Sequence, residues 1–510
     1  MKKLKFVVVL LLCAIIFAAC GGSDADVSPT TGAGGNENGE ESPAENGGDE
    51  IINSDEPNIP GYSEIAAIDM SGRTFTFLTQ VWLGTTASVD IAMEEEWVAG
   101  DPIDDAALNR KIKIEEKYNV TFNQVVSEGS TDNVNRYENA VLAGDDIYDI
   151  AITAGFNFFR LLAGGYMTEL SELAFIDVAK PYWNRNFYDA MSLVGRHFTL
   201  DGSISKRSLE CVWIMAFNKQ MIQDNQMESP FALVKEGKWT YDKMHEMGRA
   251  VARDLNGDGL MTLEDDLWGI NYTGYSLVGI INSSGVRFGR TDDRGYPEIT
   301  IGIEPNPDRL LKIYETMMDN SYSIDTYYID AGWGSLPDVQ IFGENRCLFL
   351  ATSTNHIAGQ GGFNLRALDT DFGIIPYPKW NDGAPHHIPF TEGVSHPMLS
   401  IPITNRDLES TSIILEAMAY EGHNNIIPEF YESLLMQKTV RDNESAEMIN
   451  FIFNNIQYDV GNMFNFGDML SFFRWEMATN LNMNIVSQVE RRMPVWEREM
   501  NGIVETVENN

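Results

Sequence analysis

One short segment carries side chains that could bind a hard cation. Residues 254–265 read DLNGDGLMTLED, with oxygen-bearing residues at alternating positions and Gly259 at the sixth. Alternating oxygens in such a loop converge on one calcium ion, and the glycine permits a sharp turn. Asp265 holds the last position, where a longer bidentate glutamate is usual, so we expect reduced affinity. The expected ligands are Asp254, Asn256, Asp258, the carbonyl of Leu260, Thr262 and Asp265.

The loop stands alone in the chain. The residues after it, 267–270 (LWGI), predict a strand and not the second helix of a paired calcium sensor. A calcium ion here would therefore be structural. The alternative interpretation of the same residues is a turn rich in Asp and Asn that binds no metal.

A second set of candidates follows the ends of predicted strands. Ligands of open α/β sheets bind beyond the carboxyl ends of strands. Aromatic rings pack against the C–H faces of sugars, while carboxylate and amide groups bond their hydroxyls. For each residue the alternative is ordinary packing. The candidates past strand ends are Trp82, Phe156, Asn157, Tyr272, Tyr275, Asn355 and His356. Two more are Glu210, on the predicted strand at 209–217, and Trp333, in a Gly-rich loop.

Three histidines raise the question of zinc. His386, His387 and His396 lie near Glu392, and imidazole and carboxylate groups are suitable zinc ligands. Their spacing matches no compact zinc site, and adjacent side chains in an extended chain point to opposite faces. A loop that is solvated or lines a cleft is the favoured interpretation.

The elements that must position these residues begin with an alternating pattern. Residues 73–80 predict a strand, 106–118 a helix, 120–126 a strand, 135–143 a helix and 148–153 a strand. Strands that alternate with helices at this spacing favour parallel pairing in an α/β layer.

Further elements follow in the second half of the chain. Residues 209–217, 268–272, 347–352 and 372–376 predict strands, and 310–318 a helix. Thr240 is a plausible N-cap, and the chain from residue 410 onward is mostly helical. Cys211 and Cys347 lie in apolar strand-like runs and could form a disulfide or remain two buried thiols.

The N-terminus is typical of an exported protein. Three lysines precede an apolar run over residues 6–17, which is too short to remain as a membrane span. The small residues before Cys20 resemble a bacterial lipobox, so we expect a signal peptide at 1–19 and a lipid on Cys20. The alternative is an ordinary signal peptide with an incidental cysteine. Residues 20–62 should form a disordered tether, because residues 21–60 carry ten acidic and no basic residues.

Composition excludes several function classes. The 510-residue chain carries a formal charge of −39, which argues against binding nucleic acid or anionic lipid surfaces. No apolar run after residue 20 is long enough for a membrane span, so the body is not a permease. The length predicts two or three domains.

Several segments resemble the extracellular solute-binding proteins of bacterial ABC importers, in the branch that binds carbohydrates. Residues 142–151 (LAGDDIYDIA) resemble that family's helix end and following strand, and 212–219 (VWIMAFNK) its crossing strand. Residues 238–242 (KWTYD), after Pro230, resemble its helix start, 342–350 (FGENRCLFL) a strand entry and 371–378 (DFGIIPYP) the return strand. The family usually has glycine and lysine where this chain has Asn345 and Arg346, and 383–387 (GAPHH) is unusual.

The resemblance implies a two-lobe α/β fold, like that of periplasmic binding proteins, with crossing strands and a ligand cleft. The first lobe would span 63–208 plus 372–415, and the second 209–371 plus 416–510. It implies a monomer that is not an enzyme, held by its lipid anchor at the outer face of the cytoplasmic membrane. It would capture a carbohydrate, and we expect an oligosaccharide, by lobe closure and deliver it to ABC permease subunits. A peptide ligand, a secreted glycoside hydrolase and an adhesion or scaffold lipoprotein remain alternatives.

Overall fold

The computed structural model describes residues 68–81, 91, 100–171, 173–326, 337–358, 365, 368–389, 396–435, 443–477 and 484–509. The predicted signal peptide, Cys20 and tether lie outside this part of the chain, as do Trp82, Trp333, Glu392 and the side chain of Phe156. Among the described helices, none has the length and apolar character needed to cross a membrane.

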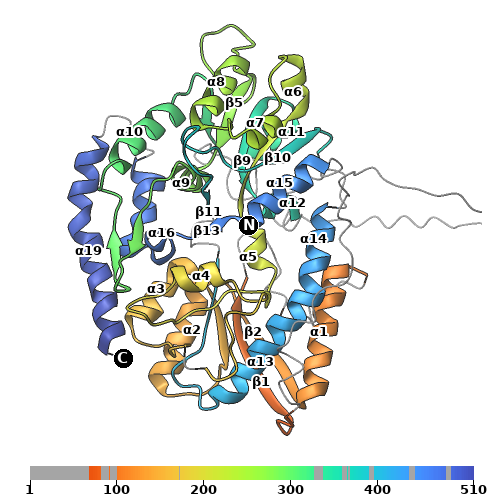
Figure 1. Cartoon of the computed structure of the whole chain (residues 1–510), viewed down its shortest axis with the longest axis vertical. Helices are drawn as coiled ribbons and strands as arrows, with labels where there is room; N and C mark the ends of the chain where they lie inside the picture. Colours follow the sequence, from red (N-terminus) through yellow and green to blue (C-terminus); the bar gives the residue numbers. More distant parts are fainter. Residues whose placement is uncertain are drawn as a thin grey trace, which may run out of the picture. The chain divides into compact units, whose positions relative to one another are not determined.

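The first sheet has the strand order β12-β3-β1-β2. Strand β1 is parallel to β2 and to β3, which confirms the predicted parallel pairing, while β12 is antiparallel to β3. These strands and the helices that join them are shown in Figure 1. Their bounds are β1 Arg73–Gln80, α1 Pro102–Tyr118, β2 Val120–Ser127, α2 Ser130–Ala143, β3 Ile150–Ala154 and β12 Pro397–Ser400.

Helix α1 shows how local sequence sets these elements. The Asp101 side chain accepts hydrogen bonds from the amides of Ile103 and Asp104, and Pro102 occupies the first turn, where its missing N–H is not needed. The helix ends at Asn119, whose backbone is left-handed with φ of 49°. The chain then enters β2 directly, so the βαβ unit needs no long loop.

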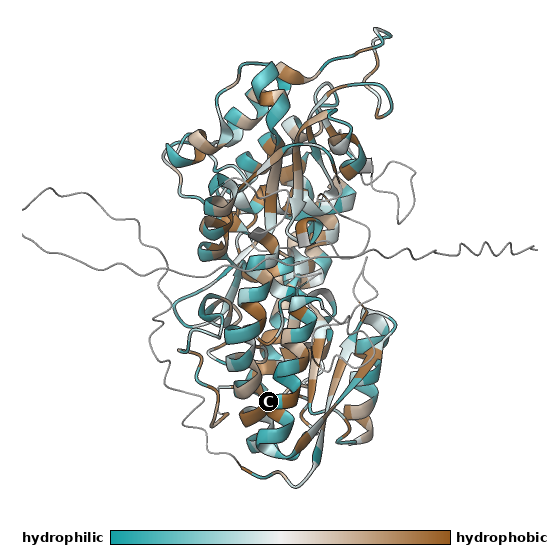
Figure 2. Ribbon diagram, turned by 90° about the vertical axis from the view of Figure 1, so that its right-hand side faces the viewer, coloured by the Kyte–Doolittle hydropathy of each residue, from teal (hydrophilic) through white to brown (hydrophobic). Residues whose placement is uncertain are grey.

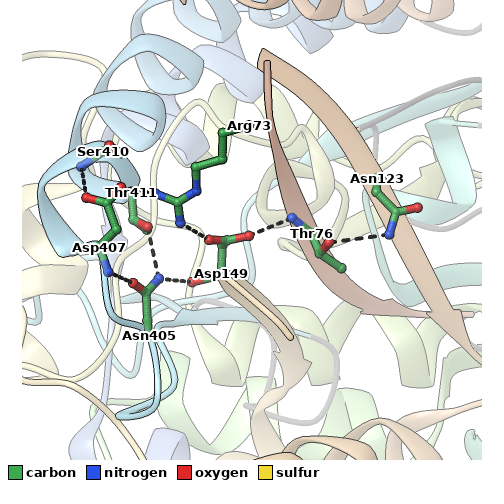
Figure 3. Close-up of polar contacts among 8 residues, drawn as sticks. All are labelled: Arg73, Thr76, Asn123, Asp149, Asn405, Asp407, Ser410 and Thr411. Atoms are coloured by element: carbon green, nitrogen blue, oxygen red, sulfur yellow. Dashed lines mark hydrogen bonds and ion pairs between the residues drawn. The ribbon is translucent and has the colours of Figure 1, made fainter. Parts of the chain in front are cut away.

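A polar network ties together the amino ends of the first sheet (Figure 3). Arg73 on β1 forms ion pairs with Asp149, just before β3, and with Asp407, beyond β12. Asp149 also accepts a hydrogen bond from the Thr76 amide at 2.8 Å. Asn405 donates to the Asp149 carbonyl at 3.1 Å, which brings in the chain after β12. This edge is the structural end of the sheet, opposite the carboxyl ends where ligands bind.

The second sheet has the order β10-β4-β9-β5-β8. Strand β4 is antiparallel to β9 and to β10, whereas β5 is parallel to β9 and β8. The predicted strands at 268–272 and 347–352 are confirmed. The bounds are β4 Trp213–Asn218, β5 Trp268–Tyr272, β8 Ser323–Asp325, β9 Cys347–Ser353 and β10 Phe372–Ile375.

Two expectations about the crossings between sheets need correction. The predicted strand at 209–217 begins only at Trp213, because Arg207–Glu210 forms the short helix α5. The first lobe was expected to resume at residue 372, but β10 pairs with β4 in the second sheet. After β10 the chain forms β11 (Ile388–Pro389), which pairs with β13 (Ile456–Gln457) in a separate small sheet. It rejoins the first sheet only at β12.

Helices surround both sheets and make up most of the C-terminal part, as the sequence predicts. In Figure 2 hydrophilic and hydrophobic residues alternate along the helices and along some strands, as in β1 (RTFTFLTQ). The predicted N-cap Thr240 is confirmed, because its side chain accepts a hydrogen bond from the Lys243 amide. The remaining bounds are α3 Gly155–Ala163, α4 Arg185–Ala190, α6 Lys219–Asp224, α7 Pro230–Lys235, α8 Tyr241–Val251, α9 Gly274–Ser283, β6 Gly289–Thr291, β7 Pro297–Ile299, α10 Asn306–Met317, α11 Pro337–Gly343, α12 Asn355–Ala358, α13 Leu408–Glu421, η2 Gly422–Ile426, α14 Ile427–Leu435, α15 Asn443–Asn454, α16 Val460–Phe464, η3 Phe466–Asp468, α17 Met469–Ser471, η4 Phe472–Glu476 and α19 Ile485–Asn509.

Both described cysteines are buried, and neither forms a disulfide within the described part of the chain. Cys211 precedes β4, whose first residue Trp213 pairs with Ser353 at the carboxyl end of β9, while Cys347 begins β9. Six residues of extended strand span about 20 Å, far beyond the reach of a disulfide. Of the two outcomes left open by the sequence, the structure has the two buried thiols.

Candidate functional site

The predicted binding residues occur where strands of the two sheets end and helices begin. In the first sheet, β3 ends at Ala154 and Asn157 lies in the first turn of α3. In the second sheet, β9 ends at Ser353 and α12 begins at Asn355. Strand β5 ends at Tyr272, and Tyr275 lies in the first turn of α9. Carboxyl ends of strands are where open α/β sheets bind ligands.

Two asparagines at these ends carry buried polar atoms without a partner. Within the described part of the chain, neither Asn157 Nδ2 nor Asn355 Oδ1 makes a hydrogen bond, and water does not reach either atom. A buried donor or acceptor left in this state costs about 1–3 kcal/mol. One atom is a donor beside the first sheet and the other an acceptor beside the second. A hydroxyl group can bond to either, since it both accepts and donates.

An aromatic pair with a guanidinium lies at the end of β5. The rings of Tyr275 and Trp475 meet edge to face with centroids 5.2 Å apart, and the Arg474 guanidinium lies 4.9 Å from the Tyr275 centroid. Helix η4 approaches this closely because residue 274 is glycine: a Cβ there would lie 2.7 Å from the Trp475 ring. The sequence does not predict that Arg474 and Trp475 lie beside Tyr275, because nothing local in residues 472–476 (FFRWE) indicates a strand end.

Tyr272 and His356 also lie at these strand ends, Tyr272 buried and His356 half-buried. The Tyr272 side chain is buried, and burial raises the pKa of its phenol. His356 Nδ1 bonds to Thr352 Oγ1, and burial lowers the pKa of the imidazole despite the opposing effect of Asp338. A lowered pKa keeps His356 neutral at pH 7, so it can offer hydrogen bonds without a charge.

Glu210 has a different place from the predicted one. It lies on α5 and not on a strand, only 2 % exposed, and its two carboxylate oxygens bind Lys206 Nζ and Arg207 Nη1. Burial opposes ionisation, but the charges of Lys206 and Arg207 outweigh it and lower the pKa of the Glu210 carboxyl. Because both carboxylate oxygens form ion pairs, Glu210 stabilises the segment that leads into β4.

The predicted calcium loop has the expected turns. Gly257 and Gly259 adopt φ of 75° and 83°, and the Asp254 carboxylate accepts hydrogen bonds from both of their amides. The loop is closed by Asp266, which accepts from the amides of Leu255 at 2.9 Å and Thr262 at 2.6 Å. The sequence analysis missed this role of Asp266, whereas the Asp265 side chain is exposed.

His387 and His396, two of the histidines suggested as zinc ligands, have different neighbours. His387 Nδ1 lies 2.9 Å from Gln457 Oε1 and 3.0 Å from Arg287 Nη2, while His396 is buried 4.0 Å from Asp201. Burial lowers the pKa of His386 to about 4 and that of His396 to about 3. Across the described ranges, no three His, Cys, Asp or Glu side chains are arranged to hold a metal ion.

Comparison with known proteins gives the fold. No family model and no curated protein matches the chain. Among solved structures, it is similar to an ABC substrate-binding protein from Listeria monocytogenes in complex with cycloalternan (12% identity, 86% of this chain and 99% of that one, TM-score 0.52). It is also similar to an ABC transporter solute-binding protein from Thermotoga lettingae bound with α-D-tagatose (10%, 85% and 100%, 0.53) and to UgpB from Mycobacterium tuberculosis in complex with glycerophosphocholine (13%, 79% and 96%, 0.52). The predicted two-lobe binding-protein fold is thereby confirmed.

Proposed function

We propose that this protein is a solute-binding protein that captures a carbohydrate and delivers it to an ABC permease. Its central support is the pair of unpartnered buried atoms, Asn157 Nδ2 and Asn355 Oδ1, at the carboxyl ends of strands in different sheets. A polyol can satisfy both, because each of its hydroxyls donates and accepts. The similar structures with cycloalternan and tagatose fit this ligand class, and none of these roles requires a bond to be made or broken.

The proposed mechanism is closure of the two lobes on the ligand. Hydroxyls that bond to Asn157 from one side and Asn355 from the other bind both only when the lobes approach each other. A ligand shifts such an equilibrium by its difference in affinity for the two states. Each hydrogen bond gained on closure contributes about 0.5–1.5 kcal/mol, so several hydroxyls are needed for a decisive shift. The aromatic pair of Tyr275 and Trp475 is suited to the apolar face of a sugar ring.

The first test is thermal unfolding of the protein with mono- and oligosaccharides, peptides and glycerophosphocholine. A ligand that binds only the folded state at a hundredfold excess over its Kd adds about 2.7 kcal/mol of stability. We expect a selective rise in melting temperature with an oligosaccharide and no turnover of it. Hydrolysis of the sugar would favour the glycoside hydrolase alternative, and a response confined to peptides or glycerophosphocholine would refute the carbohydrate assignment.

Two substitutions test whether the unpartnered asparagine atoms bind the ligand. Asn157→Leu and Asn355→Leu remove the unpartnered atoms, so each should weaken ligand binding about tenfold, which is ~1.4 kcal/mol. Each should also leave the ligand-free protein as stable or more stable, because a buried unsatisfied group is lost. Asn455→Leu is the control, since its exposed amide bonds only its own helix at Phe451 O. Equal binding by all three variants would refute the proposed site.

We also propose that residues 254–265 hold a structural calcium ion. Asp254, Asn256, Asp258, the Leu260 carbonyl, Thr262 and Asp265 would supply its oxygen ligands. The left-handed backbone of Gly257 and Gly259 supports the proposal, because a calcium loop of this kind needs a sharp turn at its sixth position. Calorimetric titration of chelator-treated protein with calcium should give one site that Asp254→Asn abolishes. Absence of binding heat, with unchanged melting in EDTA, would leave an Asx-rich turn.

The membrane attachment is a separate proposal based on the sequence. We infer that the chain is anchored through a lipid on Cys20 at the outer face of the cytoplasmic membrane, as a monomer. In a host that processes lipoproteins, Cys20→Ala should move the protein from the membrane fraction to the medium or periplasm. Retention of this variant in membranes would refute the anchor without affecting the sugar-binding proposal.

A further inference from the structure

A surface groove lies along the C-terminal helix α19, and its lining includes none of the strand-end residues described above. It has a volume of about 650 Å³ and is formed by α19, strand β7 and the start of α10. Helix α19 and α10 are neighbours in Figure 1. The groove follows α19 from Val486 to Asn501. This stretch of helix spans about 22 Å, which is the length of about four turns of a second helix.

The floor of the groove is apolar and partly open to water. Ile303 is 47 % exposed and Val486 38 %, so both present large aliphatic side chains at the surface. Met493 and Met500 also line it, and the Met493 methyl occupies space that a side chain at Gly302 would fill. Methionine is flexible and adapts to irregular apolar partners. Exposed apolar surface gathered in one groove is typical of an interaction site.

The charged residues of the groove are all acidic. Glu298, Glu490 and Glu497 line it, and no lysine or arginine does. Glu298 already pairs with Arg290 at 2.7 Å. Glu490 and Glu497 are exposed, and neither forms an ion pair within the described part of the chain. They lie seven residues apart on one face of α19, which separates them by about 10.5 Å along the axis.

Charge decides between possible occupants. The chain's own segment 21–60 has ten acidic and no basic residues, so the glutamates would repel it. A second copy of this chain, with a formal charge of −39, is also disfavoured. The length of the groove and the spacing of its two exposed glutamates favour an elongated occupant over a compact small molecule. An amphipathic helix fits better, with apolar residues toward the methionines and two cations spaced to meet the glutamates.

We propose that this groove docks a basic amphipathic helix of a partner protein, with Lys or Arg at positions i and i+7 facing Glu490 and Glu497. Such a helix would lie along α19 and bury Ile303, Val486 and Met493. The site goes beyond the proposed carbohydrate capture, since it uses none of the residues at the strand ends.

The test uses the full chain and a fluorescent 18-residue helical peptide with leucines on one face and lysines at i and i+7. A scrambled peptide of the same composition, which has no amphipathic face, is the control. At 0.15 M salt we expect the first peptide to bind at least tenfold tighter. The double variant Glu490→Lys/Glu497→Lys should lose at least tenfold in affinity, as should Met493→Glu. The matched control is Glu499→Lys/Glu505→Lys, which makes the same charge change on exposed α19 residues outside the groove.

Two results would overturn the proposal. Equal binding of the scrambled peptide would mean general attraction to an acidic protein, and so would equal losses in the two double variants. Circular dichroism and melting of each variant verify folding, which exposed glutamate substitutions should not disturb. A version of the test peptide with glutamates in place of the lysines at i and i+7 should bind the Glu490→Lys/Glu497→Lys protein and not the parent protein. Sugar binding should be unchanged throughout, so the two proposals fail independently.

Discussion

The buried ion cluster of α5 gives the sharpest test of how the two sheets are joined. Glu210 is 2 % exposed, and Lys206 and Arg207 are each 7 % exposed. Replacing Glu210 with glutamine keeps the shape of the side chain but removes the charge that both cations face. The two cations then stay buried in the crossing without their carboxylate. We expect Glu210→Gln to destabilise the protein strongly and to leave ligand affinity unchanged.

The magnitude follows from burial. Removing one partner of a buried ion pair costs about 3–5 kcal/mol, because it leaves an uncompensated buried charge. The pair Lys206–Glu210 has the same i,i+4 spacing as Arg185–Asp189 on α4, whose side chains are each 57 % exposed. Exposed i,i+4 pairs contribute only about 0.3–0.5 kcal/mol. Asp189→Asn is therefore a matched control with the same chemical change in water.

The assay is equilibrium unfolding in urea at pH 7. The pKa of Glu210 is lowered in the folded protein, so its contribution is present above its unfolded pKa and is lost as pH falls through its folded pKa. The difference between parent and Glu210→Gln should therefore shrink toward acid. A loss below 1 kcal/mol at pH 7 would refute the structural role. Weaker sugar binding with full stability would instead restore Glu210 as the ligand residue that the sequence predicts.

Three further predictions concern single features. Burial, with a smaller effect of Arg249, lowers the pKa of His245 to about 3, so the free energy of unfolding should fall as pH drops from 6.5. His245→Gln should reduce the dependence of this free energy on pH by about 1.4 kcal/mol per pH unit between pH 6 and 4, and an unchanged dependence would contradict the lowered pKa. Thr240→Ala removes an N-cap and should cost about 1 kcal/mol in urea unfolding, whereas Thr240→Ser should not. Iodoacetamide at pH 8 should modify Cys211 and Cys347 only after unfolding without reductant; no modification even then would indicate a disulfide.

Local patterns in the sequence predict the local elements well. The alternation over residues 73–80 gives β1 with its observed bounds, and Thr240 caps α8 as expected. The helix α5 is missed because it has only four residues, too few to show a helical period in the sequence. Burial of Lys206 and Glu210 depends on their pairing, which is a tertiary feature that local propensity cannot report.

Sheet membership is the second limit of sequence-based prediction. Residues 372–375 are an apolar run that would fit either sheet. Their pairing with β4, from Phe372 opposite Asn218 to Ile375 opposite Met215, joins residues more than 150 positions apart. An even longer separation in sequence explains why the contact of Trp475 with Tyr275 is not predicted. Residues at strand ends can be predicted, because they follow an apolar run in the sequence. Residues that contact them from a distant helix cannot be predicted in this way.

The two asparagines link this limit to function. A folded chain normally satisfies its buried polar atoms, since each failure costs about 1–3 kcal/mol. Asn157 and Asn355 leave one donor and one acceptor unsatisfied at the strand ends of different sheets. Under the proposed function, ligand hydroxyls that bond to both atoms would recover this free energy only when the lobes approach each other. Replacing either asparagine with leucine should then weaken binding and closure together while sparing the ligand-free fold.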